Sequence, residues 1–162
     1  MDIPKKISVK AIAIGVVVDI GGTFGSALLL GIVIGIILVF SSVPQGAPPA
    51  EASPALEAIQ KSGPMQVIYL CLGLAWTIFG GALAAWIAGR APVLHGCIVG
   101  AIGLLLSVPA VIFLPQDAPL WSRIAGFALT IPAGTSGGYL VRLWKKPAAS
   151  GMSPHQDKPV VP

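Results

Sequence analysis

Residues 11–40 read AIAIGVVVDIGGTFGSALLLGIVIGIILVF, and this stretch decides the fold of the chain. Its only ionisable side chain is Asp19. A helix rises ~1.5 Å per residue, so about 20 apolar residues cross the hydrocarbon core of a bilayer. The stretch therefore predicts a membrane span that is longer than a bilayer requires and that must tilt or extend beyond the lipid.

The composition of the whole chain supports a membrane protein. Of its 162 residues, 55% are hydrophobic and only 10% are charged, which lies outside the usual range of soluble domains. The length allows one membrane domain and no second folded domain. The net charge of +4 does not indicate a nucleic-acid partner, because the basic residues flank apolar spans and form no patch with interleaved aromatic residues. The expected partner is the lipid bilayer.

The apolar runs divide the chain into four spans. We expect an all-α fold, a four-transmembrane-helix bundle with spans at about 11–40, 65–88, 93–114 and 121–141. Residues 1–10 form a basic N-terminus, and the proline-rich tail 142–162 is expected to be disordered. The long loop 41–64 contains Ser53 and Pro54, which predict the cap and first residue of a short helix.

Charge sets the expected orientation. With both termini cytoplasmic, that side holds eight of the ten basic residues and the outer side holds Lys61 and Arg123. This asymmetry follows the positive-inside rule. It predicts an integral membrane protein with cytoplasmic N- and C-termini.

Small residues recur at helical spacing in every span. Such stripes mark faces where membrane helices approach closely. The expected helix-packing positions are Gly15, Gly22, Gly80, Gly81, Gly96, Gly100, Gly126, Gly134 and Gly138. The ends of the second and fourth spans also share a Gly-Gly pair followed by an arginine, so two repeated helical hairpins are one possible organisation.

Asp19 leads the candidate polar site. A carboxylate within a span costs roughly 2.5–3.5 kcal/mol to insert, so it requires a partner or a function. It shares a stripe with Gly15, Gly22 and Ser26, which places it against another helix, with the second and fourth spans as the best candidates. Two interpretations stay open: a proton or cation site, or a structural aspartate bonded to Thr23, Ser26 or another helix.

Arg90 and His95 extend this candidate site. Both lie at the inner end of the hairpin between the second and third spans, where Gly89 and Pro92 predict a tight turn. Arg90 is expected either to meet Asp19 or to contact lipid headgroups. His95 is expected either to join that network or to contact headgroups or the turn.

The sequence carries no recognisable catalytic motif. It contains no hydrolase elbow, phosphate loop, HExxH or haem signature, so we expect no enzymatic activity and no cofactor. Cys71 and Cys97 lack zinc spacing and are interpreted as small buried residues, which predicts no metal site.

The central hairpin, FGGALAAWIAGRAPVLHGCIVGAIG, resembles uncharacterised small four-span bacterial inner-membrane proteins. The matching features are a Gly-Gly pair, an Ala-Gly-Arg turn and a Leu-His-Gly entry into the third span. The resemblance implies a fold type and a bacterial membrane, and it implies no activity. Small multidrug transporters also have four spans and a carboxylate in the first, but here that residue is aspartate and loop 41–64 is longer.

These observations lead to two functional hypotheses. The first is a non-enzymatic membrane protein that assembles with itself or with another membrane protein through glycine-rich helix faces. The alternative is a small proton- or cation-coupled transporter that uses Asp19.

Overall fold

The computed structural model describes residues 7–42, 52–113 and 118–145, and these form five helices. They are α1 (Val9–Ser42), α2 (Ala52–Lys61), α3 (Gly63–Ala88), α4 (Pro92–Phe113) and α5 (Leu120–Trp144). Four of them, all but α2, are long and apolar enough to cross a membrane. The predicted all-α, four-span fold is confirmed. The expected disordered tail falls largely outside the described residues.

The helix ends follow local sequence signals. At the start of α1, the Ser8 hydroxyl accepts a hydrogen bond from the Ala11 N–H at 3.4 Å, which is an N-cap contact. At the end of α3, Gly89 adopts φ 68° and its N–H bonds to the Ala85 carbonyl at 3.3 Å. Only glycine takes this left-handed conformation without a steric cost. Pro92 then begins α4, so the predicted tight turn is present.

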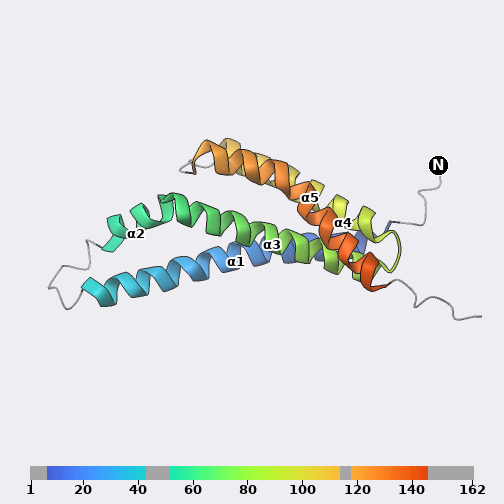
Figure 1. Ribbon diagram of the computed structural model, residues 1–162, viewed down its shortest axis with the longest axis horizontal. Coiled ribbons are helices and arrows are strands. Elements are labelled where there is room, and N and C mark those ends of the chain that lie inside the picture. The colour runs from blue at the N-terminus through green and yellow to red at the C-terminus, as the bar shows by residue number, and fades with distance from the viewer. Residues whose placement is uncertain (1–6, 43–51, 114–117, 146–162) are drawn as a thin grey trace, which may run out of the picture.

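The short helix α2 begins two residues earlier than Pro54 would place it. Ser53 therefore lies inside α2, and the predicted start of the helix is wrong by two residues. The helix packs along the far end of α1, where Leu56 and Gln60 lie over Gly35 and Gly31. Together α2 and α3 run antiparallel to α1 along most of its length (Figure 1).

The four spans form two antiparallel hairpins, α1 with α3 and α4 with α5 (Figure 1). The hairpins converge at the end of the bundle that holds the start of α1 and the end of α5, and they diverge toward the opposite end. Helix α3 lies between α1 and α5, and α4 packs on both α5 and α3.

Glycines line the contacts where the hairpins converge, and we call this region the glycine seam: Gly81, Gly96, Gly134, Gly137 and Gly138. A Cβ added at Gly81 would lie 2.5 Å from the Gly134 carbonyl oxygen. A Cβ on Gly96 would clash with the same oxygen, and one on Gly137 would clash with the Ile78 carbonyl oxygen. Helix backbones therefore touch directly here, because no side chain separates them.

Most large apolar side chains point outward. Examples on α1 are Val17, Leu28, Leu29 and Phe40, all exposed. In water such a surface would favour aggregation, but it suits contact with lipid chains. The buried interior consists instead of small residues such as Ala84 and Ala85, as expected for helices held together by close packing within a bilayer.

Candidate functional site

Asp19 lies in the interior of the bundle, with 5% of its surface exposed. It is about three turns from the start of α1, or on the order of 15 Å along the helix at ~1.5 Å per residue. Asp19 packs against α3, one of the two helices that the sequence analysis predicted as its neighbour. A Cβ added to Gly80 would lie 3.0 Å from the Cβ of Asp19. The small residues of α3 therefore leave room for the Asp19 carboxylate between α1 and α3.

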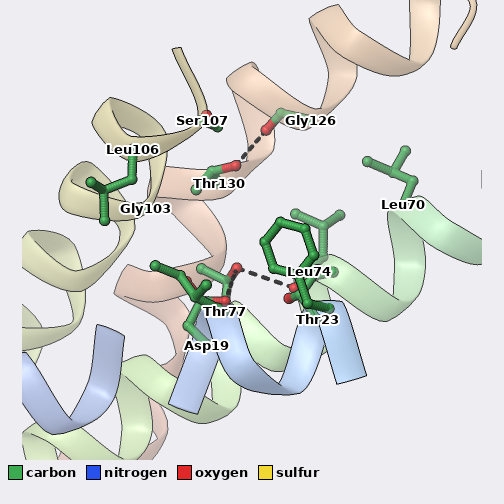
Figure 2. Close-up of a pocket in the computed structure, with 13 residues that line it drawn as sticks. Asp19, Thr23, Leu70, Leu74, Thr77, Gly103, Leu106, Ser107, Gly126 and Thr130 are labelled. Atoms are coloured by element: carbon green, nitrogen blue, oxygen red, sulfur yellow. Dashed lines mark hydrogen bonds between the residues drawn. The ribbon is translucent and has the colours of Figure 1, made fainter. Parts of the chain in front are cut away.

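One carboxylate oxygen of Asp19 has a defined partner. The Thr77 hydroxyl of α3 donates a hydrogen bond to Oδ1 at 2.9 Å (Figure 2). The same hydroxyl lies 3.1 Å from the Gly73 carbonyl oxygen, and its single hydrogen serves one of these acceptors at a time. Neither Thr23 nor Ser26, the expected local partners, bonds to Asp19 in the described part of the chain.

Thr77 was missed at the sequence level, although a signal for it exists. Gly73, Thr77, Gly80 and Ala84 are spaced by four, three and four residues. Gly15, Asp19, Gly22 and Ser26 on α1 show the same spacing. Two antiparallel helices that pair these stripes bring the one hydroxyl of the α3 stripe to the one carboxylate of the α1 stripe.

The second carboxylate oxygen lies at a pocket. Across the described residues, Oδ2 has no hydrogen-bond partner, and a Cβ on Gly103 of α4 would lie 3.1 Å from it. The pocket has a volume of about 360 Å³ and forms where the hairpins begin to diverge. We call it the carboxylate pocket, with its lining drawn in Figure 2: Asp19, Ile20, Thr23, Phe24, Leu70, Gly73, Leu74, Thr77, Gly103, Leu106, Ser107, Gly126 and Thr130.

Ser26 belongs to a different contact. Its hydroxyl donates to the Gly22 carbonyl at 2.6 Å and accepts a hydrogen bond from the Trp76 indole N–H at 3.1 Å. A side chain at Gly22 would clash with the Trp76 ring. Gly22 and Ser26 thus form a seat for the indole of Trp76, which joins α1 to α3 beyond the pocket.

His95 lies at the converging end of the bundle and is completely buried, with 0% exposure. Its Nδ1 is 3.0 Å from the Ala91 carbonyl oxygen, and its Nε2 is 3.0 Å from the Ser8 backbone N–H. Both contacts are satisfied when Nδ1 carries the hydrogen and Nε2 accepts, which is a neutral tautomer. His95 therefore ties the start of α1 to the first turn of α4.

The predicted polar site is thus divided between separate places. Asp19 and Thr23 line the carboxylate pocket, and Ser26 holds Trp76. Arg90 is exposed at the α3–α4 turn, about three helical turns from the level of Asp19, so the predicted Arg90–Asp19 contact is wrong. His95 contacts the turn through Ala91, as one alternative predicted, but its burial excludes headgroup contact.

The predicted helix-packing glycines also take different positions. Gly15 approaches Gly80 and Gly100 approaches Thr130, each through backbone atoms. Gly126 is different, because a Cβ there would meet only the Leu70 side chain at 3.9 Å, and Gly126 lines the pocket.

Cys71 is exposed, not buried, and both cysteines are free thiols. The described residues contain no cluster of metal-ligating side chains.

Comparisons with known proteins add no further constraint on the site. No family model matches the chain, and no curated protein or solved structure is similar enough to count as a match. The geometry of the pocket therefore carries the functional argument alone.

Proposed function

We propose that the protein is a small carrier in the bacterial inner membrane that exchanges protons for cations at Asp19, without catalysing a covalent reaction. One observation carries this proposal. Asp19 Oδ2 faces a pocket of about 360 Å³ inside the bundle of candidate spans and has no hydrogen-bond partner among the described residues. A carboxylate in this position is costly unless it serves a function.

The arrangement of the hairpins supports a carrier over a purely structural aspartate. A structural carboxylate is stabilised when its acceptor sites are filled, and within the described part of the chain Asp19 receives a single hydrogen bond, from Thr77. The pocket lies between two helical hairpins that are joined most closely at one end. Rocking of one hairpin against another around a midplane site is the general mode of alternating access.

The proposed orientation places the converging end of the bundle in the cytoplasm. Lys10, Arg90, Arg142 and Lys145 lie at that end, whereas Lys61 and Arg123 lie toward the other. The excess of basic residues favours a cytoplasmic location. Lys145 also donates to the Trp86 carbonyl at 2.9 Å, so it links the ends of α5 and α3 there.

A pH-jump measurement tests the carrier without knowledge of its substrate. Proteoliposomes on a solid-supported membrane are exposed to a rapid change in pH, and the transient current reports proton movement to a site within the membrane. We expect a transient current for the wild type and none for Asp19→Asn, which keeps the size of the side chain. Equal currents from the two proteins would exclude Asp19 as the proton site.

Self-assembly is a second candidate, favoured by one further observation. Gly21 and Gly25 on α1 are exposed, and an added Cβ would have no neighbour within 4 Å in the described structure. This pair is free to contact another helix, as GxxxG pairs do. Cross-linking in membranes tests it: Gly21→Leu should reduce a wild-type dimer if this face is used, and an unchanged dimer would argue against it.

A further inference from the structure

The carboxylate pocket has an unbalanced charge. Its lining holds one carboxylate, that of Asp19, and no lysine, arginine or histidine among the described residues. Four hydroxyl groups complete its polar surface, those of Thr23, Thr77, Ser107 and Thr130. When Asp19 is deprotonated, a ligand that enters the pocket therefore meets a net negative site in a medium of low dielectric constant, where an opposite charge is strongly favoured.

Hydrogen-bonding capacity narrows the ligand further. The hydroxyls of Ser107 and Thr130 donate to the carbonyls of Leu104 and Gly126 at 2.7 and 2.6 Å, and Thr77 donates to Asp19. Their hydrogens are thus engaged, and their oxygens remain as acceptors. A ligand that matches Oδ2 and these oxygens must carry hydrogen-bond donors. A protonated amine does so, with up to three donors on one cationic nitrogen.

An inorganic cation fits the pocket less well. Hard cations such as Ca²⁺ require six or more oxygen ligands, and the pocket offers fewer side-chain oxygens, namely Asp19 Oδ2 and four hydroxyl oxygens. The described residues offer no group of three carboxylate, imidazole or thiol side chains. A proton alone has no need of a pocket of about 360 Å³.

The remaining walls of the pocket are apolar. Ile20 and Phe24 come from α1, Leu70 and Leu74 from α3, and Leu106 from α4. A volume of about 360 Å³ lies within the range of sites that bind small organic molecules. Such walls favour a hydrocarbon body attached to the charged group.

We propose that the carboxylate pocket binds an amphiphilic primary amine in its ammonium form. The nitrogen lies against Asp19 Oδ2, and the hydrocarbon body lies between the leucine side chains of α3 and α4. This inference rests on the proposed carrier function and names the class of its substrate.

Binding of radiolabelled octylamine to the purified full-length chain in detergent tests the inference. We expect saturable binding to the wild type and about a tenfold or greater loss of affinity in Asp19→Asn, because a charge-assisted hydrogen bond is removed. Methylamine and octanol serve as matched competitors. Methylamine keeps the ammonium group without the hydrocarbon chain, and octanol keeps the chain without the ammonium group. Both should compete poorly.

A second variant tests the contribution of the pocket volume to binding while the Asp19 carboxylate is unchanged. Gly126→Leu fills the pocket from α5 with little steric conflict, because an added Cβ meets only the Leu70 side chain at 3.9 Å. It should weaken octylamine binding while Asp19 stays intact. Gly63→Leu, at an exposed position of α3 where an added Cβ has no neighbour within 4 Å, is the matched control and should bind octylamine as the wild type does.

The outcomes distinguish this inference from the carrier proposal. Octanol competing as well as octylamine, or binding that is unchanged in Asp19→Asn, would overturn the amine site. Methylamine competing equally would also overturn it, because the site would then recognise charge alone. A wild-type pH-jump current that requires Asp19, without octylamine binding, would leave the carrier standing and refute the amine. A wild-type protein whose pH-jump current is absent, or does not depend on Asp19, would refute the carrier proposal itself.

Discussion

The glycine seam and the carboxylate pocket lie next to each other along the same helices, yet they pack in opposite ways. In the seam, Gly81 and Gly96 both approach the Gly134 carbonyl, so the backbones of α3, α4 and α5 are in direct contact. About three turns beyond Gly96 along α4, Leu106 and Ser107 line the pocket, around which the helices separate. Gly126 of α5 also lines the pocket, so a glycine marks a closed contact only where it meets the backbone of another helix.

The difference has a consequence for substitutions. The seam has no room for an added methyl group, because the nearest atoms belong to backbone that cannot rotate away. The pocket tolerates new atoms, because its empty space can receive them. Stability should therefore depend on the seam, and ligand recognition should depend on the pocket.

The largest expected effect is at Gly81. Gly81→Ala places a Cβ 2.5 Å from the Gly134 carbonyl oxygen, and the two helices must move apart. We expect a loss of about 3 kcal/mol through overpacking. Gly21→Ala is the matched control, with open space around its Cβ, and should be neutral or slightly stabilising because alanine favours the helix. Denaturant unfolding in detergent measures both, and equal stabilities would contradict the seam.

A smaller effect is expected at His95. His95→Ala removes the acceptor of the Ser8 N–H and leaves a cavity at a fully buried position. Together these should cost about 2–3 kcal/mol and loosen the start of α1. Hydrogen exchange of the amides near Ser8 should increase in this variant. Leu94→Ala, an exposed neighbour on α4, should leave that exchange unchanged.

The smallest effect is expected at Thr77. Thr77→Val keeps the shape of the side chain and removes the hydrogen bond to Asp19, which should cost about 1 kcal/mol. Thr135→Val is the control, because the Thr135 hydroxyl bonds only to the Ile131 carbonyl of its own helix. Thermal unfolding compares the two. A Thr135→Val protein that is as destabilised as Thr77→Val would show that the bond to Asp19 adds nothing to stability.

The sequence by itself determined the elements of this fold. Long apolar runs must become helices within a bilayer, because a helix satisfies its backbone hydrogen bonds internally. Gly89 and Pro92 determined the turn between α3 and α4, because each restricts the backbone locally. The stripe that contains Asp19 also determined that this carboxylate faces protein, since the spacing of residues around a helix is fixed.

Only the tertiary structure decided which stripes meet and at what height. The pairing of α1 with α3 selects Thr77 as the partner of Asp19, and the position of α4 brings Gly103 to Oδ2. The same packing buries His95 against Ser8, 87 residues away in the chain, whereas sequence reasoning offered Asp19, headgroups or the turn, and only the turn is among its partners. Local patterns fix the direction in which a side chain points, but the relative shift and order of helices depend on the summed contacts of every glycine and hydroxyl along them.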